Sequence, residues 1–320
     1  MKAVTYRKYG SPDVLEIQEI EKPAPRENEI LIKIVAASVN PADYYILKGM
    51  GRLMGFGLIN PKKQRLGADV SGIIESVGKN VSDFEPGDEV FGDLSVCGFG
   101  SFAEYVTVPA DAVVKKPSNV SFEEAAAAPL ASITALQGLR DKGKIHSGQK
   151  VLINGASGGV GSFAVQIAKS YETEVTGVCS TEKIDPVQSI GADHVIDYTE
   201  EDFTQNGETY NLIFDTAAHR SITDYKKSLS PGGIYILIGG SIGKILQGNV
   251  MAPILSMTGT KKFRSMIAKP IQKDLKVIRE LIEDDKVKSI IDRTFPLDES
   301  ANAMQHLIDG HPAGKVVIAI

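Results

Sequence analysis

Hydrophobic and polar positions alternate over short stretches in the first third of the chain. EILIKIVAASV (29–39) and VSGIIESVG (70–78) are two such stretches, and turn sequences such as SPD, KPAP and EPGD lie among them. A period of two with β-branched residues, interrupted by proline and glycine, is typical of antiparallel strands. This part of the chain is therefore predicted to form a mostly antiparallel β-barrel or sandwich.

One helix is predicted to interrupt these strands after Asn40. Asparagine favours the position that caps a helix, and Pro41 suits the first helical position because its missing N–H would have no partner there. The NPAD corner (40–43) therefore places polar side chains at a helix start.

The pattern changes after residue 120. Ser121 and Glu124 have the spacing of a capping box and precede the alanine-rich run 125–139, which predicts a helical linker. Continuously apolar runs then alternate with helix-length stretches, which favours a parallel sheet covered by helices on both faces. The apolar runs are KVLING (150–155), EVTGVCS (174–180), HVIDY (194–198), NLIFD (211–215) and IYILIGG (234–240).

The last part of the chain returns to short amphipathic elements. Helices are predicted near 272–285 and 298–309, followed by the strand KVVIAI (315–320). We expect this tail to rejoin the first domain. The expected division is therefore 1–123 with 272–320 for one domain, and 124–271 for the other.

Composition narrows the function classes. The chain has 320 residues, 42% hydrophobic and 23% charged, and its net charge of -5 offers no basic field for nucleic acid. Two cysteines cannot build a disulfide framework, and the first residues lack a signal-peptide core, so we expect a cytoplasmic protein. The segment 241–259 is too polar for a transmembrane span and is interpreted as a lid or a subunit contact.

A cluster of glycines follows the apolar run at 151–154. Glycines between a strand and a helix let an anion approach the backbone at the positive end of the helix dipole. A nucleoside triphosphate loop would need a Gly-Lys pair, which is missing here. The dinucleotide fingerprint fits with alanine in place of its first glycine, over Ala156, Ser157, Gly158, Gly159, Val160 and Gly161.

The end of the second strand indicates which nicotinamide cofactor binds. A carboxylate there would bind the ribose 2′-OH and repel a 2′-phosphate. Here the strand ends in VCSTEK, with the small Ser180 at that position and Lys183 as a cation for the 2′-phosphate. This favours NADPH over NADH. Glu182 leaves NADH open if the strand ends two residues later.

At this point the sequence resembles the medium-chain dehydrogenase/reductase superfamily, in its zinc-independent quinone oxidoreductase branch. The resemblance covers the whole chain. It implies an α/β protein with a GroES-like β-barrel catalytic domain, a Rossmann domain, and a homodimer. It is carried by VNPADYY (39–45), LGADVSGIIESVGKNVSDFEPGDEVFG (66–92), FAEYVTVP (102–109), VLINGASGGVGSFAVQIAK (151–169) and the closing GKVVIAI (314–320).

The residues that would bind catalytic zinc are missing. Zinc members carry Gly-His-Glu where this chain has Gly67, Ala68 and Asp69, and Cys97 stands alone where a structural zinc site needs four cysteines. We therefore expect no zinc. Hydride transfer must then depend on positioning and on hydrogen-bond donors, which suits acceptors that delocalise the developing charge. The expected substrate is a small apolar quinone or conjugated carbonyl compound.

The resemblance also implies site residues. Asn40, Asp43 and Tyr45 match the active-site corner, where Asn40 would orient the nicotinamide or substrate and Tyr45 would donate to the substrate oxygen. The alternatives are a helix cap for Asn40, a first-turn carboxylate for Asp43 and a core aromatic for Tyr45. Thr134, Tyr198, Gly239, Gly240 and Ser241 match cofactor positions.

An insertion at 49–65 departs from shorter family members. It brings the apolar side chains Met54, Phe56, Leu58 and Ile59 near the expected site, as a lid for an apolar acceptor or as a packed surface loop. The prediction is a zinc-free NADPH-dependent reductase. The alternatives are an alcohol dehydrogenase acting on a saturated carbonyl and a non-catalytic NADPH-binding protein.

Overall fold

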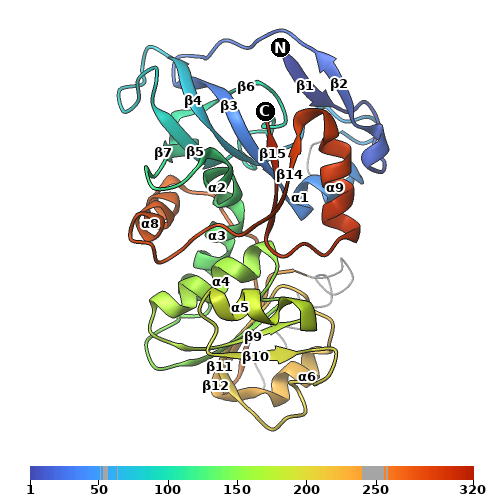
Figure 1. Ribbon diagram of the computed structural model, residues 1–320, viewed down its shortest axis with the longest axis vertical. Helices are drawn as coiled ribbons and strands as arrows, with labels where there is room; N and C mark the ends of the chain where they lie inside the picture. The colour runs from blue at the N-terminus through green and yellow to red at the C-terminus, as the bar shows by residue number, and fades with distance from the viewer. Residues whose placement is uncertain (51, 53–56, 63, 240–255, 257–258) are drawn as a thin grey trace. The chain divides into compact units, whose positions relative to one another are not determined.

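The computed structural model describes residues 1–320 apart from 51, 53–56, 63, 240–255 and 257–258 (Figure 1). The chain divides into two compact units. The first comprises Met1–Leu130, Pro270–Asp284 and Ser289–Ile320, and the second comprises Ala131–Lys269 and Asp285–Lys288. The first unit thus contains both ends of the chain.

A mixed, mostly antiparallel sheet of seven strands dominates the first unit (Figure 1). Its order is β14-β15-β3-β4-β5-β7, with β6 also paired to β3, and only β14 and β15 run parallel. A separate antiparallel pair is formed by β1 (Lys2–Thr5) and β2 (Glu16–Glu19). The strands of the large sheet are β3 (Glu29–Val39), β4 (Asp69–Val77), β5 (Glu89–Asp93), β6 (Tyr105–Pro109), β7 (Val113–Lys115), β14 (Ile291–Pro296) and β15 (Lys315–Ala319).

The last strand lies directly beside the strand that leads into the predicted corner. β15 pairs antiparallel with β3, and Val316 is opposite Val39. The alternating apolar positions of β3, such as Ile30, Ile32 and Ile34, are buried in the core of this unit, as their period of two predicts. The sheet register therefore brings Lys315 close to the residue that follows β3.

Among the described residues, the helices wholly within the first unit are α1 (Pro41–Leu47), α2 (Phe122–Ala127), α8 (Gln272–Glu283) and α9 (Ser300–Asp309). The predicted capping box is confirmed at α2. Ser121 Oγ accepts the Glu124 N–H at 3.2 Å, and Glu124 Oε2 accepts the Ser121 N–H at 2.8 Å. The first unit also has the 3-10 segments Pro12–Val14, Ala110–Ala112 and Leu297–Glu299. The second unit has the 3-10 segment Thr181–Lys183 and the π-helical segment Gly138–Lys142.

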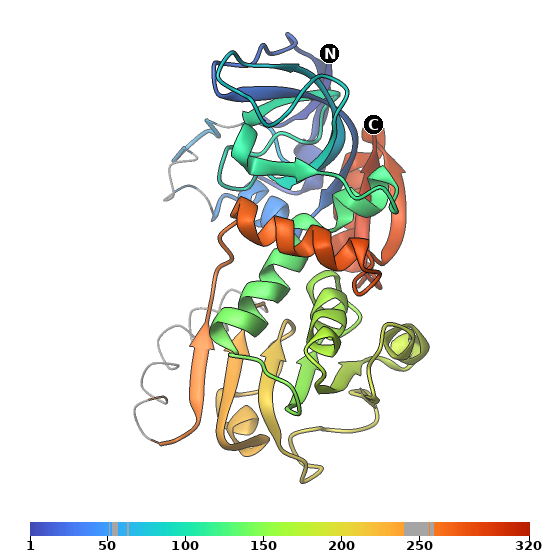
Figure 2. The same ribbon diagram turned by 90° about the vertical axis from the view of Figure 1, so that its left-hand side faces the viewer.

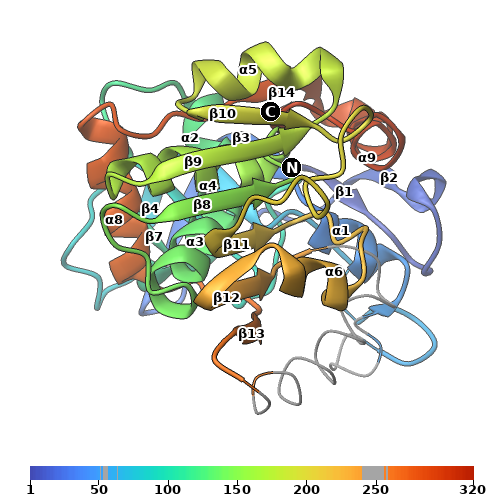
Figure 3. The same ribbon diagram turned by 90° about the horizontal axis from the view of Figure 1, so that it is seen from below.

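The second unit has the predicted parallel sheet. Its six strands run in the order β10-β9-β8-β11-β12-β13 and lie side by side in two views (Figures 2 and 3). The strand order reverses direction between β8 and β11, where open α/β sheets bind ligands beyond their carboxyl ends. The strands are β8 (Lys150–Asn154), β9 (Glu174–Cys179), β10 (His194–Asp197), β11 (Tyr210–Asp215), β12 (Leu229–Leu237) and β13 (Lys262–Ser265).

The helices associated with this sheet are α4 (Gly159–Ser170), α5 (Ile184–Ser189) and α6 (Ile222–Lys227), while α3 (Pro129–Gln137) begins in the first unit and continues into the second. β12 starts earlier than its apolar run because Leu229 pairs with Tyr210 before a register shift. Among the residues described, no helix is both long and apolar enough to cross a bilayer.

Candidate functional site

The glycine loop joins β8 to α4 in the second unit. Gly155 has a φ of +81°, which glycine adopts without strain. A Cβ on Gly161 would lie 2.0 Å from the Gly155 carbonyl oxygen, so only glycine lets the first turn of α4 pack against the loop. These two glycines are therefore explained by the chain's own packing.

Gly158 is different because the protein leaves space beside it. A Cβ there would have one neighbour, the Gly155 oxygen, at 3.5 Å, which is an ordinary contact. Gly158 caps α4, and among the described residues no side-chain hydrogen bond covers this cap at the positive end of the helix. A bare backbone at a helix start fits the pyrophosphate of a dinucleotide.

Ala156 stands where the fingerprint has its first glycine, and it packs inside the unit. Its N–H donates to Val178 O at 3.0 Å, and it is fully buried. The neighbouring strand carries Gly177, where a Cβ would lie 3.1 Å from the Ala156 methyl group. The extra methyl group is thus accommodated by a glycine on β9, and the loop keeps its course. Ser157, Gly159 and Val160 are half-buried.

The residues expected at the 2′-phosphate meet at the carboxyl ends of β9 and β10. The register pairs Asp197 with Cys179, and the Tyr198 N–H donates to Cys179 O at 3.0 Å. Ser180 begins the short turn that carries Lys183, and Tyr198 is 52% exposed. Ser180, Lys183 and Tyr198 therefore lie at one edge of the sheet.

The remaining cofactor candidates lie on other elements. Thr134 is a buried residue of α3, and Gly239 follows β12, where a Cβ would lie 2.5 Å from Thr216 O. Leu58 and Ile59 are 68% and 85% exposed. The other predicted residues of the cofactor site and the insertion lie outside the described residues: Gly240, Ser241, Met54 and Phe56.

The corner predicted at 40–45 lies in the first unit. Asn40 occupies the cap of α1 and Pro41 its first position, as predicted. The Asp43 carboxylate closes this helix start, since Oδ2 accepts the Asn40 N–H at 2.9 Å and Oδ1 accepts the Gly67 N–H at 2.9 Å. Tyr45 is half-buried, with its ring centroid 5.9 Å from that of Tyr44.

Burial raises the pKa of Asp43 to about 7. The side chain is completely buried, which penalises its charged form, and the negative charge of Asp69 raises the pKa further. The backbone donors of Gly67 and Asn40 and the charge of Lys315 act in the opposite direction. Asp43 therefore changes its charge near neutral pH.

The amide of Asn40 is held at both ends. Nδ2 donates to Asp69 Oδ2 at 2.9 Å and to Ser38 O at 3.3 Å, while Oδ1 accepts a hydrogen bond from Lys315 Nζ. Asn40 is thus bound into a buried polar network behind the helix start.

Asp69 is the centre of that network. It is fully buried, and besides Asn40 it accepts the Ser38 hydroxyl at 2.6 Å and the Leu130 N–H at 2.8 Å. Lys315 Nζ lies 3.3 Å from its Oδ2, and only 4% of the lysine side chain is exposed. Asp93 is opposite Asp69 in the β4–β5 register, and burial, together with the charge of Asp69, raises its pKa to about 7.

Comparison with known proteins connects both units to one family. A family described as "Alcohol dehydrogenase GroES-like domain" matches residues 26–118, and one described as "Zinc-binding dehydrogenase" matches 190–318. A tomato (Solanum lycopersicum) protein named 2-methylene-furan-3-one reductase is 36% identical over 99% of this chain and 79% of its own length. The chain belongs to the medium-chain dehydrogenase/reductase family.

Two further proteins place it in the quinone oxidoreductase branch of that family. The chloroplast envelope quinone oxidoreductase homolog of Arabidopsis thaliana is 33% identical, over 99% of this chain and 98% of the relative. The structure of Escherichia coli quinone oxidoreductase complexed with NADPH matches with a TM-score of 0.86 and 25% identity, covering 100% of both chains. The predicted GroES-like and Rossmann fold is confirmed.

In this medium-chain reductase, an alanine and an aspartate stand at the position of the zinc signature. Ala68 is fully buried, and Asp69 is paired with Lys315. Within the described part of the chain, no three His, Cys, Asp or Glu side chains gather as a possible metal site. A methyl group and a lysine-bound carboxylate thus stand where zinc members have histidine and glutamate.

The sequence pattern does not predict the network partners of Asn40. It indicates no role for Ser38 or Lys315, and it indicates Asp69 only as a replacement for a zinc ligand. Lys315 and Asn40 are 275 positions apart, and only the pairing of β15 with β3 brings them together. The available signal was a lysine directly before the closing apolar run VVIAI.

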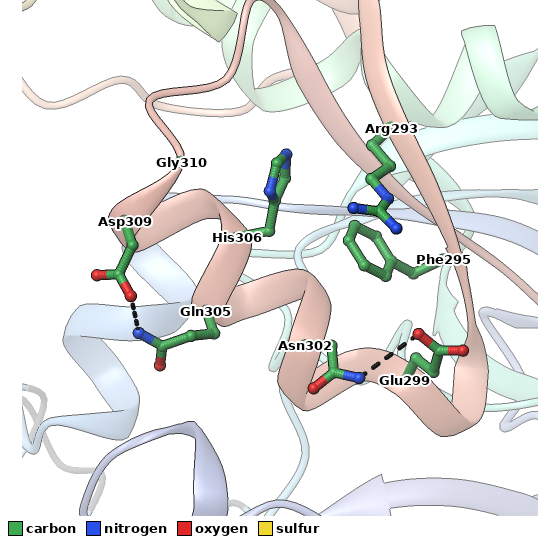
Figure 4. A pocket seen from close by; sticks show the side chains of 8 residues that line it. All are labelled: Arg293, Phe295, Glu299, Asn302, Gln305, His306, Asp309 and Gly310. Carbon is green, nitrogen blue, oxygen red and sulfur yellow. Dashed lines mark hydrogen bonds between the residues drawn. The ribbon is translucent and has the colours of Figure 1, made fainter.

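A surface depression of about 450 Å³ lies elsewhere on the first unit, between β14 and α9 (Figure 4). The Arg293 guanidinium is 4.7 Å from the centroid of the Phe295 ring, and Gln305 pairs with Asp309. None of the predicted site residues lines this depression. It therefore has no part in the site built above.

Proposed function

We propose that this protein is a zinc-free, NADPH-dependent oxidoreductase that reduces quinones or α,β-unsaturated carbonyl compounds. The observation that carries the proposal is the uncovered start of α4, with Gly158 open to a ligand and Lys183 and Tyr198 at the neighbouring strand ends. The named relatives, a furanone reductase and quinone oxidoreductases, support the same substrate class.

The residues present fit the cofactor. The first turn of α4, from Gly158 to Gly161, would hold the pyrophosphate, and Ser180, Lys183 and Tyr198 would hold the 2′-phosphate. We assign Thr134, Gly239, Gly240 and Ser241 to the nicotinamide end. When bound, NADPH supplies the hydride.

The corner on α1 would act on the substrate oxygen. Reduction of a conjugated acceptor develops negative charge on an oxygen through a delocalised system, which a single hydrogen-bond donor stabilises more readily than an isolated alkoxide. We assign this donor role to the Tyr45 hydroxyl, which also suits proton donation. Asn40 and Asp43 hold the corner that carries Tyr45.

We further propose a homodimer in the cytoplasm. The homodimer is what the resemblance to the quinone oxidoreductase branch implies, and the cysteine content supports the location. Two cysteines are too few for a disulfide framework, which suits a reducing compartment. Light scattering after gel filtration tests the dimer, and fractionation of the native cells tests the location.

The proposed function is tested by NADPH oxidation against quinones, enones, saturated ketones and aldehydes, after metal analysis of the protein. We expect turnover with quinones or enones at a zinc content well below one atom per chain, unchanged by a chelator. Ketone reduction that a chelator abolishes would identify an alcohol dehydrogenase instead. Tight NADPH binding with no turnover would identify a binding protein.

A further inference from the structure

Lys315 is a buried cation at the back of the α1 corner. Its ammonium group donates to Asn40 Oδ1 and lies 3.3 Å from Asp69 Oδ2 and 3.5 Å from Val39 O. Burying a lysine is costly unless it is paired. The chain nevertheless has a lysine at a strand position where burial of an apolar residue would cost less free energy.

Asp69 accepts most of its hydrogen bonds from groups other than Lys315. Its oxygens already accept bonds from Ser38, Asn40 and Leu130. What the lysine adds is a balancing charge and a donor for the oxygen end of the Asn40 amide. Because Asp69 only accepts and Lys315 only donates, the pair permits one orientation of that amide.

Asn40 directly precedes α1, the helix that carries the predicted catalytic side chain. The backbone N–H of Asn40 donates to Asp43, and Tyr45 lies two residues after Asp43 on the same short helix. We propose that Lys315 is a positioning residue, which fixes the Asn40 amide and with it the helix start that presents Tyr45 to the substrate. This inference rests on the proposed reductase function.

The test compares Lys315→Met with Lys116→Met. Lys116 is a matched control because it is a lysine of the same unit with 5% of its side chain exposed, bound to Glu89, Pro117 O and Val120 O. Each variant is measured for kcat and KM with 9,10-phenanthrenequinone and an aliphatic enone, for NADPH affinity by fluorescence, and for thermal unfolding. The conservative variant Lys315→Arg keeps the positive charge and the hydrogen-bond donors for Asn40.

We expect Lys315→Met to lower kcat by roughly tenfold to a hundredfold, because small displacements of a positioned group have effects of this size. NADPH affinity should stay within about twofold, since the glycine loop is untouched. Lys116→Met should keep the wild-type kcat, and Lys315→Arg should recover most of it. Equal kcat for Lys315→Met and Lys116→Met, or a Lys315→Arg variant as slow as Lys315→Met, would overturn the proposal.

A crystal structure separates this proposal from the proposed function. In Lys315→Met, and in Lys315→Arg, the Asn40 side chain is compared with the wild type. We expect the amide to turn or spread in Lys315→Met and to keep its place in Lys315→Arg. An unmoved amide in Lys315→Met, or a displaced one in Lys315→Arg, contradicts the proposal. If the wild type reduces neither acceptor, the proposed function fails and this structure alone decides on Lys315.

Discussion

The starts of α1 and α4 differ in whether a side chain binds at the first backbone N–H groups of the helix. Every helix start has backbone N–H groups without partners inside the helix. At α1, the Asp43 carboxyl group accepts the N–H groups of Asn40 and Gly67, so a side chain of the protein covers this end. At α4, the cap is Gly158, and within the described part of the chain it has no side-chain hydrogen bond.

The start of α1 is therefore already bound by a side chain of the protein, whereas the start of α4 can bind an external anion. A carboxylate at α1 excludes a phosphate from that helix, whereas the uncovered end of α4 attracts one. In the first unit, the buried groups therefore hold neighbouring parts of the protein in fixed positions. These groups are Asp43, Asp69 and Lys315. The second unit uses missing side chains to receive a ligand.

The largest effect is expected from making α4 resemble α1, by Gly158→Asp. A carboxylate near the pyrophosphate should weaken NADPH binding about a thousandfold, since two charges about 4 Å apart repel by about 4 kcal/mol at a protein surface. The fold should keep or gain stability, because aspartate is a good helix cap. Calorimetric titration with NADPH, beside thermal unfolding, checks both effects.

Gly158→Ala is the matched control for that variant. Its methyl group has room, with the Gly155 oxygen at 3.5 Å, so NADPH affinity should fall by at most about tenfold. If the aspartate variant binds NADPH as tightly as the wild type, α4 is not the anion site.

The next effect concerns the other helix start. Tyr45→Phe should lower kcat about a hundredfold, the lower end of what a positioned proton donor contributes, while the affinity for NADPH stays unchanged. Tyr44→Phe on the same helix is the control, and steady-state kinetics with an enone gives the comparison. Undiminished turnover in Tyr45→Phe would reduce this residue to a packing role.

A smaller effect is expected at the strand ends of the second unit. Lys183→Ala should raise the Kd of NADPH about tenfold and leave that of NADH nearly unchanged, because only NADPH carries the 2′-phosphate. Lys150→Ala, at the amino end of the same sheet, is the control. Equal losses for both cofactors would show that Lys183 does not read the 2′-phosphate.

The smallest effect is a pH dependence of stability. The folded-state pKa of Asp43, about 7, lies above the ordinary value for an aspartate, so the folded state binds more protons between about pH 4 and pH 7. The stability linked to this group is present below about pH 4 and is lost as the pH rises through 7, by at most about 1.4 kcal/mol per pH unit.

Asp43→Asn should therefore lose less stability than the wild type between pH 5 and pH 8, although it is less stable at pH 5 by about 1–3 kcal/mol because a buried N–H loses its acceptor. Urea unfolding at the two pH values measures this. Asp93 titrates in the same direction in both proteins and so cancels from the difference. Parallel losses in the two proteins would show that Asp43 does not titrate in this range.

Local features of the sequence predicted the helix starts well. Asn40 with Pro41, and Ser121 with Glu124, occupy the predicted cap positions because their partners lie within three residues. The start of α4 at Gly159 lies before the apolar stretch that predicted it, since glycines give no helical pattern. The parallel strands followed from their continuous apolar runs.

The buried network behind α1 could not be predicted in this way. Its members come from β3, β4 and β15, and their contacts depend on sheet register, which the local pattern of a single strand does not determine. Lys315 precedes an apolar run, where a lysine normally marks an exposed strand end. Only its partners Asn40 and Asp69 explain its burial.

The central claim, reduction of a conjugated acceptor, is tested most directly by where the hydride arrives. The purified protein is given NADPH deuterated at the transferable C4 position and an aliphatic enone, and the product is analysed by NMR. The account predicts a saturated ketone with one deuterium on the carbon β to the carbonyl group. An allylic alcohol with deuterium on the carbonyl carbon would contradict it.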